Sequence, residues 1–411
     1  CFNMRRKPEL LVPASSLEVL KTAVRYGADA VYIGGEVFGL RAKAKNFSLE
    51  EMKEGVDFAH ERGVKVYVTA NILAHNADIG PVKVYFNDLK TVKPDALIIS
   101  DPAIFTIAKE ILPDMELHIS TQANNTNYGT YNFWYNLGAK RVVSARELSL
   151  NEIKQIRENI PDDMEIETFV HGAMCISYSG RCLLSSFMTG RDANKGACTH
   201  PCRWKYAVVE ESRPGQYMPV EENERGTYIF NSKDLCMIEH IPELIDAGID
   251  SFKIEGRMKT ALYVATVART YRKAIDDYLE SPDKYRENLP LYRKWISQCT
   301  YRQYTTGFFF GKPDETTQIY DNNVYERDYV YLGIVREVSD NGEFVLEQKN
   351  KFSVSEKIEV MKPDGRDIEV NVISIKDEEG NEMESCPHPK QKLLVKLSET
   401  PERGDVLRVK E

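Results

Sequence analysis

The sequence predicts an α/β fold: a (β/α)8 TIM-type barrel with a Cys-rich insertion before its last strand, and then a small C-terminal antiparallel β domain. Eight short segments rich in β-branched residues alternate with helical patterns, which is typical of parallel βα units. These repeats cover about 270 residues, near the roughly 250 of such barrels. We expect the barrel at 4–300 with its insertion at 172–236, an aromatic segment and linker at 301–326, and the β domain at 327–411.

The eight expected barrel strands follow one another at regular spacing. In chain order they are Glu9–Val12, Ala30–Ile33, Lys65–Thr69, Ala96–Ile99, Glu116–Ile119, Arg141–Ser144, Glu165–Val170 and Ser251–Ile254. Ser149 followed three residues later by Glu152 is a capping box at a helix start. Glycines at helix C-caps are expected at Gly27, Gly63, Gly138 and Gly248. The repeat count favours a closed barrel over an open doubly wound sheet, and no G-x-G-x-x-G follows the first strand.

The second half of the chain completes the barrel and adds the β domain. A helix is expected to start near Asp234, and the long final helix of the barrel spans Ala261–Leu279. The aromatic stretch Tyr301–Phe310 either packs as a hydrophobic plug or stacks on unpaired bases. From Tyr329 onward, alternating strands and turns around Gly342, Gly365 and Gly380 predict the antiparallel domain.

Composition and charge restrict the class of protein. The chain is 42% hydrophobic and 28% charged, which excludes a disordered or fibrous protein. No apolar run approaches the roughly 18 residues of a membrane helix, and the start lacks an apolar signal core, so we expect a cytoplasmic protein with no membrane contact. A net charge of −9 argues against broad nucleic-acid binding.

The insertion is the exception to this acidity. Between His171 and Tyr206 five cations face one anion, Asp192. The cations are Arg181, Arg191, Lys195, Arg203 and Lys205. They either balance an anionic thiolate cluster or form a docking surface for a phosphate backbone.

Five of the eight cysteines fall within the 62 positions from 175 to 236, and this clustering predicts metal or cluster ligation. They are Cys175, Cys182, Cys198, Cys202 and Cys236. Zinc prefers tight pairs, and only Cys198 and Cys202 are spaced that closely. A four-thiolate iron–sulfur cluster tolerates the wider spacing of Cys175 and Cys182. Both metals stay open on spacing alone.

Polar residues follow the expected strands where barrels of this type place their active sites. They are Asn71, Ser100, Asp101, Ser120, Thr121, Gln122, Arg146, Glu147, His171, Lys253, Glu255 and Arg257. Arg146, Lys253 and Arg257 suit carboxylate binding, and His171 suits proton transfer. The alternative is a ring of ion pairs that stabilises the loops. His118, in mid-strand, is expected to be an interior side chain.

The segment from Glu167 to Ser185 carries the most specific pattern. It reads E-x-F-x-x-G-A-x-C-x4-G-x-C-x-L-S and resembles the signature of the collagenase-like peptidase U32 family at every fixed position. Among members of that family, the chain is most similar to the bacterial prephenate-dependent tRNA uridine hydroxylases. The further matching segments are Pro8–Leu11, Gly27–Tyr32, Arg146–Ser149, Asn231–Leu235, Lys253–Arg257 and Tyr304–Phe308.

The resemblance implies 5-hydroxylation of the wobble uridine of tRNA, with prephenate as co-substrate and the tRNA anticodon arm as partner. It implies a [4Fe–4S] cluster on Cys175, Cys182 and Cys198, with the fourth ligand open between Cys202 and Cys236. Related members hydroxylate ubiquinone precursors or a ribosomal RNA cytidine, so the substrate stays open within the family. A partner subunit from the same family stays open as well.

Two other classes of function remain. One is a collagenase-type peptidase with an unrecognised nucleophile, although the chain contains no G-x-S-x-G and no H-E-x-x-H. The other is a non-enzymatic RNA-binding protein with a structural zinc, which the net acidity disfavours. We therefore expect an iron–sulfur enzyme whose thiols lie beside a cation-lined barrel mouth.

Overall fold

The computed structural model divides the chain into two compact units. The first contains residues 1–17, 29–258 and 302–321, and the second contains residues 18–28, 259–301 and 322–411. Within these units the structure describes residues 6–35, 47–175, 177–195, 197–203, 207–208, 211, 214–215, 218–219, 234–256, 259–299, 304–311, 329–386 and 388–411.

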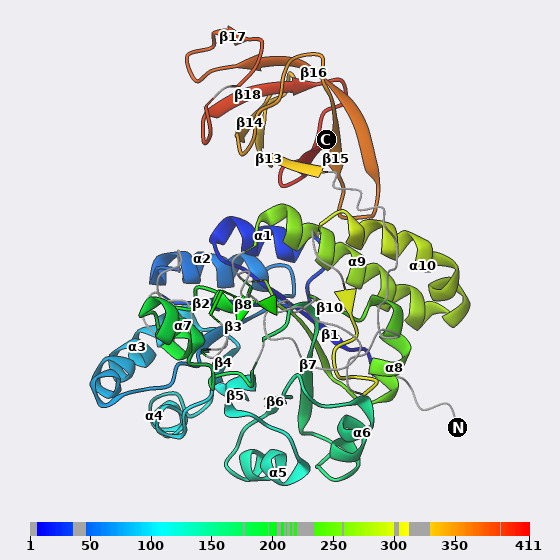
Figure 1. The fold of residues 1–411 in the computed structure, drawn as a ribbon. Coiled ribbons are helices and arrows are strands. Elements are labelled where there is room, and N and C mark those ends of the chain that lie inside the picture. Colours follow the sequence, from blue (N-terminus) through cyan, green and yellow to red (C-terminus); the bar gives the residue numbers. More distant parts are fainter. Residues whose placement is uncertain are drawn as a thin grey trace. The chain divides into compact units, whose positions relative to one another are not determined.

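The first unit is built on a closed ring of eight parallel strands (Figure 1). These are β1 (Glu9–Pro13), β2 (Ala30–Gly34), β3 (Lys65–Ala70), β4 (Ala96–Ile99), β5 (Glu116–Ile119), β6 (Arg141–Val143), β7 (Glu165–Ala173) and β11 (Ser251–Ile254). The ring closes because β11 pairs in parallel with both β1 and β7. The predicted barrel and its eight strands are confirmed.

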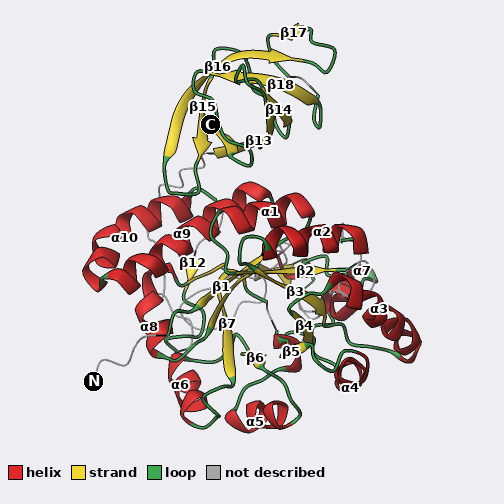
Figure 2. Cartoon of the chain, turned by 180° about the vertical axis from the view of Figure 1, so that it is seen from behind, coloured by secondary structure: helices red, strands yellow, loops and turns green. Residues whose placement is uncertain are grey.

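Helices follow the strands and lie outside the ring, as Figure 2 shows. In the first unit they are α2 (Leu49–His60), α3 (Ile79–Val92), α4 (Pro102–Ile111), α5 (Tyr128–Asn136), α6 (Leu150–Glu158) and α8 (Ile241–Asp246). The expected capping box of Ser149 and Glu152 starts α6. The glycines expected at helix C-caps all have positive φ; they are Gly27, Gly63, Gly138 and Gly248.

The barrel interior is filled by apolar and aromatic side chains from alternate positions of the strands. One cluster contains Leu11, Ala30, Tyr32, Tyr67, Ala96 and Ile98. His118 is 1% exposed, and its Nε2 lies 2.7 Å from the Glu116 carboxylate. The expectation that His118 is an interior side chain is therefore confirmed.

The insertion after β7 contains short helices and turns, and also strands that the sequence analysis did not predict. Its elements are α7 (Leu184–Thr189), the 3-10 turns Ala193–Lys195 and Pro201–Arg203, β8 (Ala207–Val208) and β9 (Met218–Pro219). The prediction of a helix near Asp234 is wrong: Asp234–Cys236 forms β10, which pairs antiparallel to β7. The pairing places buried Leu235 and Cys236 opposite Gly172 and His171. Helix α8 begins only at Ile241.

The second unit contains part of α1 (Leu17–Arg25), two consecutive helices and the C-terminal strands. The helices are α9 (Ala261–Glu280) and α10 (Pro282–Ser297). The strands are β13 (Tyr329–Val338), β14 (Phe344–Glu347), β15 (Lys357–Met361), β16 (Asp367–Lys376), β17 (Glu382–Met383), β18 (Lys392–Leu397) and β19 (Val406–Lys410). They form one antiparallel sheet that closes through a β15–β16 pairing, which confirms the predicted domain.

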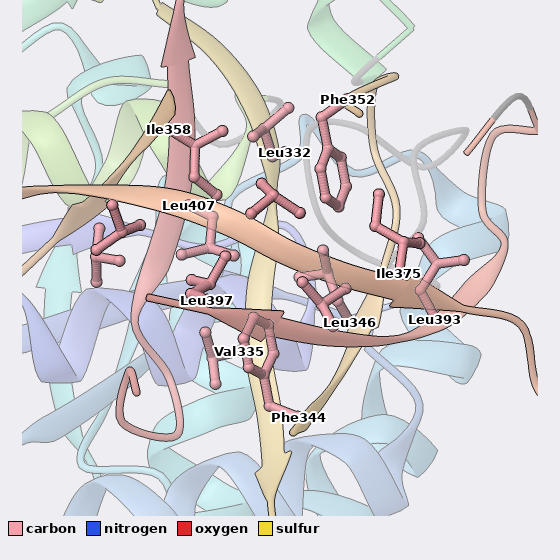
Figure 3. Packing of buried hydrophobic residues seen from close by; sticks show 14 of the residues in the cluster. Leu332, Val335, Phe344, Leu346, Phe352, Ile358, Ile375, Leu393, Leu397 and Leu407 are labelled. Carbon is pink, nitrogen blue, oxygen red and sulfur yellow. The ribbon is translucent and has the colours of Figure 1, made fainter. Parts of the chain in front are cut away.

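The C-terminal strands enclose their own hydrophobic core (Figure 3). Phe344 and Leu332 are fully buried within it, and Phe352 is 1% exposed. The turns expected around Gly342, Gly365 and Gly380 have positive φ at those glycines. This module therefore packs its own core, as a separate domain should.

Candidate active site at the carboxyl ends of the barrel strands

A buried ion-pair network occupies the amino ends of the strands. Arg141, the first residue of β6, is 3% exposed. Its guanidinium lies 2.7 Å from Glu9, 2.6 Å from Glu165 and 2.8 Å from Glu167. Burial raises the pKa of Glu9, but the Arg141 charge and the hydrogen bonds from Arg141 and Tyr67 together outweigh burial and leave that pKa below its usual value. In barrels of this type, polar groups at this end serve stability.

Glu167 extends this network toward the other end of the barrel. Its Oε1 lies 3.4 Å from the Nζ of Lys253, on β11, and both residues are buried. The Lys253 ammonium also lies 4.5 Å from the ring centroid of Tyr32 and 5.2 Å from that of Phe169. Burial lowers the pKa of Lys253, while the Glu167 carboxylate opposes the shift. The lysine is thus a desolvated cation held between one carboxylate and two aromatic faces.

Arg146 connects the barrel mouth to the start of the insertion. Its guanidinium stacks over the ring of Phe169 at 4.0 Å. One Nη lies 3.6 Å from the Sγ of Cys175 and donates to the Ser179 hydroxyl at 3.2 Å. Its Nε is buried and has no hydrogen-bond partner among the residues that the structure describes. A buried donor in this state is available to a ligand.

Side-chain amides at neighbouring strand ends add hydrogen-bond acceptors to the barrel mouth. The Asn71 amide donates to Ser120 Oγ at 3.2 Å, and the backbone N–H of Gln122 donates to the same oxygen at 3.3 Å. The Ser100 hydroxyl donates to the Asn71 carbonyl at 3.0 Å. Asn71 Oδ1 and Gln122 Oε1 are both buried, and in the described part of the chain neither has a hydrogen-bond partner. Two unsatisfied acceptors and one donor at a barrel mouth indicate a site for a polar ligand.

Two glycines of the Glu167–Ser185 motif bring the insertion and the strands close together. Gly172 has φ 108, and a Cβ there would lie 2.6 Å from the Glu255 carbonyl oxygen. Gly180 has φ 76 and lies against Gln122, whose carbonyl oxygen would be 3.5 Å from an added Cβ. Both positions have a left-handed backbone that favours glycine, and at Gly172 the close approach of Glu255 also excludes a Cβ. The insertion thus begins directly over the mouth residue Gln122.

The remaining expected site residues differ in their surroundings. His171 is 1% exposed, its ring lies 5.5 Å from that of Tyr304, and burial lowers its pKa to about 3. It is therefore neutral near pH 7 and poorly suited to general acid–base catalysis. Burial raises the pKa of Glu147. Asp101 caps α4 by accepting from the N–H of Ala103 at 2.8 Å.

Other sequence expectations divide between the core and residues outside the description. Glu255 is half-buried, and its N–H donates to the His171 carbonyl at 2.8 Å. Tyr304 and Phe309 of the aromatic stretch are buried, as expected for side chains that pack in a core. Phe310 is 48% exposed, and its ring contacts that of His240. Arg257 lies outside the described residues. No local pattern in the sequence could identify Tyr32 and Phe169 as partners of Lys253, because these contacts join strands that are far apart along the chain.

The five cysteines of the insertion differ in their exposure. Cys175 and Cys198 are exposed, Cys182 and Cys202 are half-buried, and Cys236 is buried. The Cys198 sulfur accepts from the N–H of His200 at 3.4 Å. Within the described ranges, no group of three or more His, Cys, Asp or Glu side chains is placed to hold a metal ion. The same part of the chain contains no helix long and apolar enough to cross a membrane.

A closed parallel barrel with cations and unsatisfied amides at the carboxyl ends of its strands has the architecture of a barrel enzyme. Residues 15–319 match the model of peptidase family U32, and residues 327–408 match the model of the family's C-terminal domain. The chain belongs to peptidase family U32.

Curated relatives cover most of the chain. tRNA hydroxylation protein P1 of Bacillus subtilis is 42% identical over 396 residues, which is 95% of this chain and 92% of the relative. tRNA hydroxylation protein P of Escherichia coli is 40% identical, over 87% of each chain. A 23S rRNA 5-hydroxycytidine synthase of Escherichia coli is 39% identical over 66% of this chain and 40% of the relative.

Proposed function

We propose that this chain hydroxylates C5 of the wobble uridine in tRNA, with prephenate as co-substrate. The observation that carries the proposal is its 42% identity to a tRNA hydroxylation protein along 95% of the chain and 92% of the relative. Both the barrel and the β module lie within this match. The barrel mouth supports it, since within the described ranges it offers buried polar groups that no other protein group contacts by a hydrogen bond.

The cations of the mouth suit a co-substrate with two carboxylates. Arg146 offers a buried Nε, and Lys253 offers a desolvated ammonium beside Phe169. Charge-assisted hydrogen bonds to carboxylates are strong in such an environment. Arg257 is assigned to the same role from its place after β11 in the sequence. In this assignment Arg146 and Lys253 orient the co-substrate, and Gln122 and Asn71 accept hydrogen bonds from a hydroxyl or an N–H group.

The chemistry requires a redox group that side chains do not supply, because C5 of uridine is neither acidic nor bears a leaving group. A [4Fe–4S] cluster would supply electron transfer there. The donor set fits in type and number: Cys175, Cys182 and Cys198 belong to one insertion, with Cys202 or Cys236 as the fourth ligand. Arg146 lies 3.6 Å from Cys175, so a cluster held there would lie close to the mouth.

The proposal is tested by complementation. The chain is expressed in a Bacillus subtilis strain that lacks its own tRNA hydroxylation proteins, and nucleosides from digested tRNA are measured by mass spectrometry. We expect 5-hydroxyuridine and its derivatives to reappear. Unchanged tRNA together with a new 5-hydroxycytidine in ribosomal RNA would show that ribosomal RNA, and not tRNA, is the substrate. Cleavage of a collagen peptide with both RNAs unchanged would favour a peptidase.

Iron content tests the thiol assignment. Anaerobically purified protein should contain about four irons and absorb broadly in the visible range. Cys175→Ser should lose most of both signals, because a thiolate ligand is removed. Cys299→Ser is the matched control, since Cys299 lies in the second unit outside the insertion and should keep both. Comparison of Cys202→Ser with Cys236→Ser identifies the fourth ligand. A colourless protein with one zinc would contradict the assignment.

A further inference from the structure

Helix α7, in the insertion, exposes the side chains that a helix normally buries. Phe187 is 86% exposed, Leu183 is 70% exposed and Met188 is 41% exposed. Leu183 and Phe187 are four residues apart and therefore lie on the same face of the helix. A contiguous apolar group with such exposure on a soluble protein indicates an interaction site.

The inner face of the same helix is made of hydroxyls. Ser185 is fully buried, and its Oγ lies 3.0 Å from the Thr199 hydroxyl and accepts from the Thr199 N–H at 3.1 Å. The Thr189 hydroxyl lies 3.1 Å from the same Thr199 oxygen. Nearby, the Asn194 amide donates to the Cys182 carbonyl at 3.2 Å. Hydrogen bonds thus fix α7 with its polar side inward and its apolar side outward, which is the reverse of the usual amphipathic arrangement.

The surroundings of this face are cationic. Arg181 and Arg191 flank α7 in sequence, and both are exposed. They belong to the segment in which five cations stand against one anion, in a chain of net charge −9. An exposed ring with exposed arginines four and six residues away in the sequence is a combination typical of single-stranded nucleic-acid binding, in which phosphates contact the cations and a base stacks on the ring.

The size of the apolar face also favours a nucleotide over a protein surface. Three side chains are a small part of the roughly 1,200–2,000 Å² buried in a stable protein–protein interface. One ring is sufficient for one base, because every base has a π face of similar size.

We propose that Phe187, supported by Leu183 and flanked by Arg181 and Arg191, is a stacking platform for an unpaired base of the RNA substrate. This inference rests on the proposed function, which supplies the RNA, and adds the residues that hold it outside the barrel mouth. The platform places a loop nucleotide beside the insertion that begins over Gln122.

Binding of a fluorescein-labelled RNA hairpin with unpaired uridines in its loop, followed by anisotropy, tests the platform. Phe187→Ala should weaken binding about 5- to 150-fold, which is the range expected for the loss of one stacked base. Phe187→Trp should bind like the wild type. Phe133→Ala is the matched control, because Phe133 is 56% exposed on α5, and it should also bind like the wild type.

Salt dependence separates the ring from the cations. Arg191→Gln should lower the slope of log affinity against log salt by about 0.7 if one phosphate contact is lost, whereas Phe187→Ala should leave that slope unchanged. Equal affinity of Phe187→Ala and wild type would overturn the platform. So would a change in oligomeric state of Phe187→Ala with unaltered RNA affinity, which would show a contact between copies. Failure of the wild type to bind any RNA would overturn the proposed function as well.

Discussion

Replacement of Arg141 by Met should destabilise the protein more than any other single change considered for this barrel. The side chain is 3% exposed and lies within 2.8 Å of three carboxylates, those of Glu9, Glu165 and Glu167. Its removal takes a closely placed counter-charge from three buried or partly buried carboxylates, and breaking one buried pair in this way costs about 3–5 kcal/mol. Urea denaturation of wild type and variant measures the difference in the free energy of unfolding.

A matched control and a pH series make this prediction specific. Arg62→Met removes an exposed guanidinium 3.4 Å from Glu61 and should cost less than about 1 kcal/mol. In the wild type the pKa of Glu9 is lowered below 4.5 in the folded state, so its contribution to stability is present above that pH and is lost on acidification. In Arg141→Met the lowering by the Arg141 charge and hydrogen bonds is lost, while burial still raises the pKa of Glu9 and the Tyr67 hydrogen bond still lowers it, so the variant should lose less stability on acidification than the wild type. Parallel pH profiles would contradict the network.

Lys253→Met should impair the use of prephenate without a comparable loss of stability. Met fills a similar volume, and Glu167 keeps its 2.8 Å contact with Arg141, so the fold should change little. A hydrogen bond between a charged donor and a carboxylate contributes about 1.5–3 kcal/mol, which corresponds to roughly a 10- to 150-fold rise in the KM for prephenate. Steady-state formation of 5-hydroxyuridine at varied prephenate concentration measures this effect.

The control for Lys253 carries the same charge change at the other end of the barrel. The Lys140 ammonium lies 3.7 Å from Glu165 and is partly exposed, so Lys140→Met should leave the KM unchanged. Lys253→Arg should recover part of the binding, because it restores a cation. A Lys253→Met protein with normal KM but a lower free energy of unfolding would assign this lysine to the fold alone.

The architecture could be predicted from the sequence because barrel strands have local signals. Each of the eight strands is a short segment that contains β-branched residues, and cap residues such as Ser149 mark the starts of helices between them. Strand β10 was missed because Leu235 and Cys236 form it only by pairing with β7, and this tertiary contact is absent from a local pattern. Helix α10 was missed because Pro290 lies inside it, where proline normally argues against a helix.

The site could be predicted only in part, for the same reason. Strand ends identified Arg146, Lys253 and Gln122 as mouth residues, since position along a barrel strand determines the end at which a side chain lies. The sequence does not pair Arg141 with Glu9, because 132 residues separate them. It also suggested His171 as a proton carrier, although burial among barrel residues keeps its pKa at about 3. Burial depends on the assembled structure and not on the residue type.

The hydroxyl contacts of α7 have a consequence for how this protein lineage can diversify. The hydrogen bonds that fix the helix join Ser185, Thr189, Asn194 and Thr199 to groups within residues 182–199. Because these hydrogen bonds lie within the segment itself, its exposed residues can be substituted without changing the barrel. If the platform holds RNA as proposed, substitutions confined to its exposed residues should change the choice of RNA and leave the barrel unaltered.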